Sequence, residues 1–131
     1  MKITIKATKI ELTPKLKEFI EEQINSLEKF AKRILEEKSR EKFLKKKKEK
    51  IEARVEIREK ERGFYYAECN LILPHKLLRA ESLQKNLKSA IHEVKKELKR
   101  ELKEHKEKFL AKMKRETRKL RRELKVSESI K

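Results

Sequence analysis

The side chains of this chain that can do chemistry are mostly cationic. Its 131 residues include 40 lysines and arginines and 23 aspartates and glutamates, for a formal net charge of +17 at pH 7. The charge is unevenly placed, because residues 51–83 carry six basic and six acidic residues whereas residues 84–131 carry 18 and 8. Lysine and arginine at this density neutralise phosphates, so the pattern predicts the binding of a polyanion.

No catalytic or metal-binding pattern accompanies this charge. His75, His92 and His105 are far apart, and the last two are 13 residues apart on one predicted helix, beyond chelating distance. The single cysteine, Cys69, lies in an apolar run and is predicted to be a small core residue. One glycine cannot build a phosphate-binding loop. The sequence therefore predicts no enzyme, no metal, no cofactor and no small-molecule substrate.

The bulk composition sets the size of the core and the compartment. Apolar residues make up 36% of the chain, enough for one modest core. No stretch approaches the ~20 apolar residues of a membrane span, and the alternating start MKITIKATKI lacks the apolar block of a secretory signal. With one cysteine and no disulfide, the prediction is a cytoplasmic protein that does not bind membranes.

The elements that must position the basic side chains are predicted from periodicity. Strict alternation predicts strands at Lys2–Ala7, Ile51–Arg58, Phe64–Leu73 and Leu77–Glu81, with Lys60–Gly63 as a turn. The odd-numbered residues of the first three strands form one apolar face, which includes Cys69, and Leu78 and Ala80 are predicted to face inward from the fourth.

Two amphipathic helices are expected beside these strands. Thr13-Pro14 is typical of a helix start, with threonine as the N-cap. The first helix has one apolar stripe, at Leu16, Phe19, Ile20, Ile24, Leu27, Phe30, Ala31 and Ile34, with Gln23 as its polar member. The second has its core face at Leu87, Ala90, Ile91, Val94, Leu98 and Leu102, beyond which the stripe thins.

Together these elements predict an α+β fold in the order β-α-β-β-β-α, a four-stranded sheet with two helices on one face. The predicted domain covers residues 1–108 and is followed by a basic helical arm at 109–131. A charged insertion at 36–50 either extends the first helix or forms a loop. In the arm, Lys112–Lys125 has eight basic residues against Glu116 and Glu123, a density that favours an anionic partner over a merely solvated face.

Three sequence blocks resemble one known family. ITIKATKIELTPKLKEFIEEQINSLEKF, AECNLILPHKLLRAE and SAIHEVKKELKRELKEHKEK are similar, in this order, to the ribosome hibernation-promoting factors, also called ribosome-associated translation inhibitors. Positions that depart from the family pattern include Ala7, Gln23, His92 and Glu97. The resemblance implies the same β-α-β-β-β-α fold and the silencing of idle ribosomes from the mRNA and tRNA channel of the small subunit. Because 109–131 is too short and too basic for the C-terminal domain of long members, the chain resembles a short form.

The hypothesis at this stage is a ribosome-binding translation inhibitor, monomeric away from the ribosome, whose partners are the small ribosomal subunit and its rRNA. The candidate rRNA-binding residues are Lys29, Lys32, Arg33, Lys76, Arg79, Lys95, Lys96, Lys99, Arg100, Lys103, Lys106 and Lys108. The resemblance implies Lys29, Arg79, Arg100, Lys106 and Lys108, and the others follow from charge and helical face. A generic RNA-binding domain and a helical protein-interaction module are the alternatives.

Overall fold

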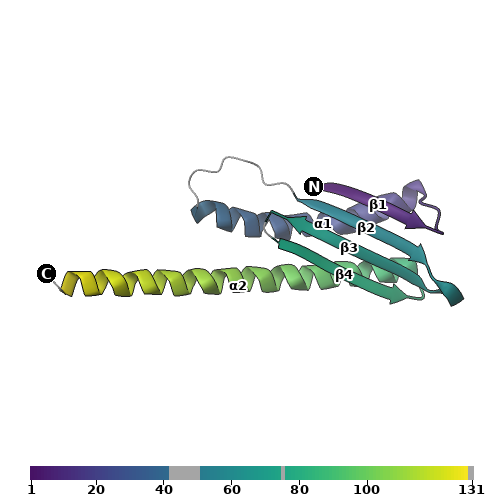
Figure 1. Ribbon diagram of the computed structural model, residues 1–131. Coiled ribbons are helices and arrows are strands. Elements are labelled where there is room, and N and C mark those ends of the chain that lie inside the picture. The colour runs from purple at the N-terminus through teal and green to yellow at the C-terminus, as the bar shows by residue number, and fades with distance from the viewer. Residues whose placement is uncertain (42–50, 75, 130–131) are drawn as a thin grey trace.

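The computed structural model describes the backbone of residues 1–41, 51–74 and 76–129, and the side chains of these residues except 34–41, 109 and 125–129. Figure 1 shows one sheet with both helices on the same face. The elements are β1 (Lys2–Thr8), α1 (Pro14–Glu41), β2 (Glu52–Glu59), the 3₁₀ turn η1 (Glu61–Gly63), β3 (Tyr65–Leu73), β4 (Lys76–Gln84) and α2 (Leu87–Ser129). The predicted α+β fold and its element order are confirmed.

The sheet has the order β1-β2-β3-β4, so β1 and β4 are its two edges. β1 runs parallel to β2, and the β2–β3 and β3–β4 pairs are antiparallel. A parallel pair needs a crossover connection, and α1 lies in that connection between β1 and β2. α2 then follows β4 and runs back along the sheet beside α1 (Figure 1).

Polar caps begin both helices. The backbone N–H of Leu16 donates to Oγ1 of Thr13 at 3.2 Å, which confirms the predicted N-cap of α1. The N–H of Lys88 donates to Oδ1 of Asn86 at 2.8 Å, so an asparagine starts α2 in the same way. In the β2–β3 turn, Arg62 has a φ of 65° and Gly63 a φ of 74°, and the left-handed conformation explains the glycine there.

The core lies between the sheet and the two helices. The buried side chains come from α1 (Ile20, Ile24, Leu27, Ala31), from residue 51 and the strands (Ile51, Ala53, Val55, Ile57, Ala67, Cys69, Leu71, Leu73, Leu78, Ala80) and from α2 (Ala90, Ile91, Val94, Leu98, Leu102). Cys69 is fully buried, as predicted, and burial, with a smaller effect of the Glu68 charge, raises the pKa of its thiol to about 12. The thiol is therefore a packing group rather than a nucleophile.

β4 is longer than its predicted range of Leu77–Glu81. The paired register continues to Gln84, which lies opposite Tyr65. The apolar alternation fades there because Ser82 and Gln84 take the inward positions while Leu83 points outward and is 51% exposed. Backbone pairing with β3 thus extends a strand beyond the end of its hydrophobic pattern.

α2 is one continuous helix of 43 residues, roughly 65 Å long at 1.5 Å per residue. Among its described side chains, the last that is fully buried is Leu102, and those beyond Met113 are exposed, including Leu120 and Leu124. The end of α2 therefore projects past the sheet (Figure 1). α1 continues to Glu41, so the first part of the predicted insertion at 36–50 is helical, whereas 42–50 lie outside the described residues.

Candidate nucleic-acid interface

The flank of α2 that faces α1 is built from lysines. Nζ of Lys95 donates to Oε1 of Gln23 on α1 at 3.1 Å. One turn later, Nζ of Lys99 lies 4.8 Å from the ring centroid of Phe30 on α1. Lys103 and Lys106 continue the same flank, because residues three and four apart lie on one side of a helix. The core stripe through Leu98 therefore fixes the direction in which these lysines point.

Lys103 and Lys106 reach a groove between the two helices. It has a volume of about 250 Å³ and is lined by Phe30, Arg33, Leu102, Lys103, Lys106, Glu107 and Leu110. The guanidinium of Arg33 lies 6.0 Å from the Phe30 ring, so cations from both helices surround one aromatic side chain. We call Arg33, Lys99, Lys103 and Lys106 the interhelical cluster.

Lys29 and Lys32 are exposed on α1, near this cluster in sequence. Nζ of Lys32 lies 3.2 Å from Oε1 of Glu28, and the N-terminal ammonium of Met1 lies 3.1 Å from the same oxygen. The hydrogen bond from the N-terminal ammonium, with help from Lys32, lowers the pKa of Glu28. Lys32 is thus partly neutralised within the protein.

The flank of α2 that faces β4 differs in charge. A hollow of about 280 Å³ is lined there by Lys76, Leu77, Leu78, Arg79, Glu101, Glu104, His105 and Lys108. Burial, followed by the charge of Glu97, raises the pKa of Glu101. This flank has glutamates where the opposite flank has lysines, so it is a poorer surface for phosphates.

Arg100 and Lys96 point away from the sheet and are exposed. The Arg100 guanidinium is bound to the carboxylate of Glu97 and, at 2.7 Å, to that of Glu104. The hydrogen bond with Glu97 is the main reason that the pKa of Arg100 is raised. Arg100 would have to leave two carboxylates to bind a phosphate.

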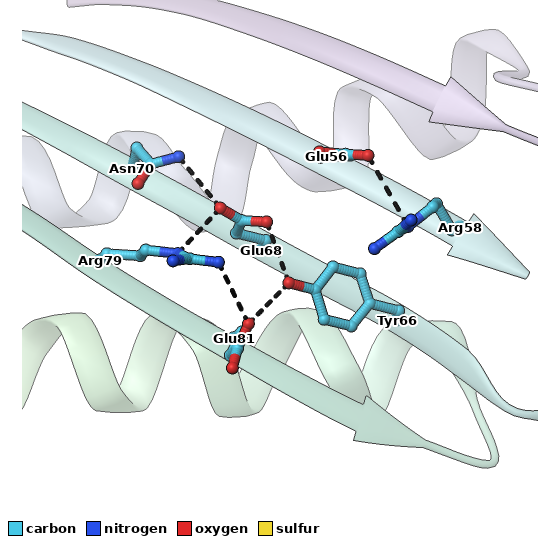
Figure 2. Close-up of polar contacts among 7 residues, drawn as sticks. All are labelled: Glu56, Arg58, Tyr66, Glu68, Asn70, Arg79 and Glu81. Atoms are coloured by element: carbon cyan, nitrogen blue, oxygen red, sulfur yellow. Dashed lines mark hydrogen bonds and ion pairs between the residues drawn. The ribbon is translucent and has the colours of Figure 1, made fainter. Parts of the chain in front are cut away.

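Arg79 lies on the outer face of the sheet, away from the helices. Figure 2 shows it between Glu68 and Glu81, with its Nε 2.9 Å from Glu68 and an Nη 3.3 Å from Glu81. The phenol oxygen of Tyr66 lies 2.9 Å from Glu68 and 2.7 Å from Glu81, and its single hydrogen is donated to one of them at a time. Burial and these two carboxylates raise the pKa of Tyr66 to about 12, so the phenol remains a donor.

The outer face as a whole is close to neutral. Its ionisable side chains are Lys2, Lys6, Arg54, Arg58 and Arg79 against Glu52, Glu56, Glu68 and Glu81, which share the face by strand alternation and register. The positive charge on α2 and the balance on this face make the helix layer the more positive side of the molecule.

The twelve candidate residues therefore do not form one patch. Arg33, Lys95, Lys99, Lys103 and Lys106 gather between the helices, and Lys29 and Lys32 lie on the exposed side of α1. Lys76 and Lys108 lie at the β4 flank, Arg79 on the outer face, and Lys96 and Arg100 on the solvent side of α2. Which of them contact RNA stays a prediction.

Sequence reasoning missed the part that Phe30 plays in this site. The residue was assigned to the core stripe, but it is half-buried and lies beneath cations from both helices. Phe30 lies three residues before Arg33, and this spacing predicts the contact between these two side chains on one helix. The contact of Phe30 with Lys99 depends instead on the packing of α2 against α1. Leu110, which also lines the groove, lies beyond the apolar stripe identified from the sequence.

Two further classes of site were searched for in the described part of the chain. Among residues 1–41, 51–74 and 76–129, no group of three or more histidine, cysteine, aspartate or glutamate side chains is placed to hold a metal ion. In the same residues, no helix is long and apolar enough to cross a membrane.

The fold and the charge distribution define a class of small α+β protein with a strongly basic helix layer. The chain belongs to the family described as sigma 54 modulation protein / S30EA ribosomal protein, whose profile matches residues 3–110. The resemblance to ribosome-associated hibernation factors is thereby confirmed. No curated protein sequence matches the chain.

Two solved structures are similar to this one in fold. The N-terminal domain of Protein Y from Thermus thermophilus is 19% identical with a TM-score of 0.63, and the match covers 80% of this chain and 99% of that one. A ribosomal subunit interface protein from Coxiella burnetii is 14% identical with a TM-score of 0.55, and the match covers 81% of this chain and 98% of that one. At these identities the likeness supports the shared fold.

Proposed function

We propose that this chain is a non-enzymatic, cytoplasmic translation inhibitor that binds the small ribosomal subunit and occupies the channel for mRNA and tRNA. The observation that carries the proposal is the division of charge between the two faces. α2 is strongly basic, whereas the outer face of the sheet has nearly equal numbers of cations and carboxylates. Membership of a family described as ribosomal supports rRNA as the polyanion.

The inhibition is steric and needs no chemical step. The helix layer faces the rRNA, and the interhelical cluster neutralises phosphates on either side of the groove around Phe30. Lys29 and Lys32 extend this contact along α1, and Lys95 is held by Gln23 at the other end of the flank. The neutral outer face of the sheet then points away from the rRNA. A folded domain held in the channel excludes mRNA and initiator tRNA.

The strong salt dependence of phosphate contacts provides the first test. The chain is sedimented with purified small subunits and with whole ribosomes over a series of salt concentrations. Each phosphate contact should contribute roughly 0.7–0.9 to the slope of log affinity against log salt. With four cations of the interhelical cluster engaged, we expect a slope of about −3 or steeper. Binding that does not change with salt would contradict the electrostatic mechanism.

The second test distinguishes the channel from another site. The chain is added to an in vitro translation reaction and to initiation complexes assembled with labelled mRNA and initiator tRNA. We expect inhibition of initiation and mutual displacement between the chain and these ligands. Undiminished translation at saturating occupancy would place it elsewhere on the ribosome, and equal affinity for unrelated RNA would favour a generic RNA-binding domain. Capture by a protein partner alone would favour the helical interaction module.

A further inference from the structure

A hollow lies on the outer face of the sheet, at the end of the domain opposite to the projecting end of α2 (Figure 1). The end of β1, the end of β2 with the turn that follows it, and the end of β4 line it, and we call it the outer hollow. Its volume of about 550 Å³ is in the range of small-ligand sites. We propose that the outer hollow binds a guanine nucleotide, with the phosphates on three cations: Lys9, Arg58 and Lys60.

Two of these cations are positioned by one aromatic ring. The guanidinium of Arg58 lies 4.8 Å from the ring centroid of Tyr66, and Nζ of Lys60 lies 5.4 Å from it. The phenol oxygen of Tyr66 is held by Glu68 and Glu81, so the ring has a fixed place on the sheet (Figure 2). An aromatic ring attracts cations without neutralising their charge as a carboxylate does. Two positive charges are therefore brought together beside the outer hollow.

The cations of the outer hollow are only weakly paired within the protein. Nε of Arg58 is buried without a hydrogen-bond partner, and its ion pair with Glu56 spans 3.7 Å. Within the described part of the chain, neither Lys9 nor Lys60 takes part in an ion pair. Arg79, on the same face of the sheet, is held by two carboxylates instead. An anionic ligand can therefore bind at the outer hollow without breaking a short ion pair.

The third cation, Lys9, is placed by an unusual backbone conformation. It follows Thr8, the last residue of β1, which pairs with Arg58 on β2. Its φ is 59°, in the left-handed region that residues with a side chain seldom adopt. Glycine would adopt this conformation at a lower cost, so a lysine there adds a cation at the expense of local strain. Strain of this kind is concentrated at binding and catalytic sites, which supports a ligand beside Lys9.

The remaining side chains of the outer hollow suit a guanine base. Phe64 is half-buried and Leu83 is 51% exposed, and together they provide an apolar surface for a purine. Glu59 and Glu61 are the two carboxylates of the lining. The Watson–Crick edge of guanine has adjacent N–H donors that one carboxylate accepts together, whereas adenine has an acceptor nitrogen there, which a carboxylate repels. The carboxylates should therefore select guanine, while the cations hold the phosphates.

Binding is measured on the free full-length chain by calorimetric titration with GDP. Salt of about 0.15 M screens nonspecific attraction to the net charge of +17. Because exposed side chains line the outer hollow, we expect moderate affinity, with a dissociation constant below about 1 mM. Nuclear magnetic resonance of the labelled chain locates the site, and the amide signals of Lys9 and of residues 58–64 should shift.

Two results of these measurements would overturn the proposal. One is the absence of binding at about 5 mM GDP, and the other is a set of shifts confined to the lysine flank of α2. The outer hollow and the interhelical cluster lie on opposite faces of the sheet. No ribosome is present in the titration, so its outcome is independent of the proposed function.

Removal of single cations tests the phosphate contacts. Lys9→Gly keeps a residue suited to the left-handed backbone, and Lys60→Ala removes the second ammonium, so each should weaken GDP binding roughly five- to tenfold. Lys6→Ala is the matched control, because Lys6 is exposed on the same face of β1 but does not line the outer hollow. It removes the same charge and should change the affinity by at most about twofold. Equal losses in Lys6→Ala and Lys9→Gly would overturn the site, and thermal melting verifies that each variant is folded.

Comparison of nucleotides tests the selection of the base. ADP should bind roughly tenfold more weakly than GDP, and pyrophosphate more weakly still. The double variant Glu59→Gln/Glu61→Gln raises the net charge, so nonspecific attraction would strengthen the binding of both nucleotides. We expect GDP alone to lose affinity, which reduces its preference over ADP to about twofold or less. Equal affinities of the unaltered chain for GDP and ADP, or pyrophosphate binding as tight as that of GDP, would refute guanine recognition.

A guanosine within a single RNA strand offers the same chemistry as a free nucleotide, and the short strands UUGUU and UUAUU separate these two sources. If UUGUU shifts the signals of the outer hollow at a lower concentration than GDP, and UUAUU does not, the site binds a guanosine in RNA. If GDP shifts them and UUGUU does not, the ligand is a free guanine nucleotide. Equal shifts with UUGUU and UUAUU at these residues would contradict guanine selection in either form.

Discussion

Leu98 and Lys103 lie five residues apart on α2 and should separate stability from RNA binding. Leu98 is 0% exposed in the packed face of the helix. Replacing it with alanine removes three carbon atoms from a site enclosed by both the sheet and α1, which should cost about 2–5 kcal/mol of unfolding free energy. For a domain of this size, about 4 °C per kcal/mol converts this loss into a fall in Tm of roughly 8–20 °C.

Lys103 is exposed at the mouth of the interhelical groove. Lys103→Ala should change the unfolding free energy by at most about 0.5 kcal/mol, because no packed contact of the core is lost. If its ammonium neutralises one rRNA phosphate, the slope of log affinity against log salt should become shallower by roughly 0.7–0.9. Leu98→Ala, measured at a temperature where it remains folded, should keep the slope of the unaltered chain.

The assays are thermal unfolding by circular dichroism and ribosome co-sedimentation across a salt series. Charge reversal at Arg100 and Lys106 extends the comparison, with weaker binding and a folded domain expected for both, and with unchanged melting expected for Lys106. At Arg100 the melting temperature should also fall slightly, because the substitution removes its ion pairs with Glu97 and Glu104. Similar losses of fold in Leu98→Ala and Lys103→Ala would refute the division between a core face and a binding flank. An unchanged salt slope in Lys103→Ala would remove this lysine from the interface.

Two further predictions concern the ends of the chain. Deleting residues 109–131 should leave a folded domain that binds ribosomes more weakly, because Leu102 is the last fully buried one among the described side chains of α2. Limited trypsin digestion of the full chain tests whether residues 109–131 contact rRNA. Cleavage at Arg121 and Arg122 should slow when ribosomes are present, and equal rates with and without ribosomes would mean that the arm does not contact RNA. The second concerns acid stability, since the lowered pKa of Glu28 means that its contacts with the N-terminal ammonium stabilise the fold above the unfolded pKa and are lost as pH falls through the folded pKa. Glu28→Gln should therefore lose less stability than the unaltered chain in urea unfolding between pH 7 and about pH 3, and an equal loss would contradict the linkage.

The strands and helices were predictable where the spacing of apolar residues and the positions of polar caps indicate the same element. Thr13 and Pro14 mark the start of α1, and alternation marks β2 and β3, because one residue in two must enter the core. The end of β4 could not be predicted in this way. Its last residues are held by backbone pairing with β3. Because their inward positions are polar and Leu83 is exposed, the alternation of apolar and polar residues does not predict a strand there.

The basic character of the site was predictable from composition, but the distribution of its cations and their ion pairs among the faces of the domain was not. The ion pairs of Arg100 are of the i,i+3 and i,i+4 type and follow from spacing alone. Those of Arg79 depend on the β3–β4 register, which places it opposite Asn70 and beside Glu68 and Glu81. The contact of Lys99 with Phe30 depends on the packing of α1 against α2, which no local pattern describes.

The core stripe of α2 explains why one helix can serve two different surfaces. Leu98 and Leu102 point into the core, and the helical period then directs Lys95, Lys99, Lys103 and Lys106 toward α1. The same period directs Glu101 and Glu104 toward β4, where they line a hollow with Lys76 and where the charge of Lys76 acts on Glu101. A polyanion should therefore be attracted to the first flank rather than to the second, where carboxylates offset part of the positive charge.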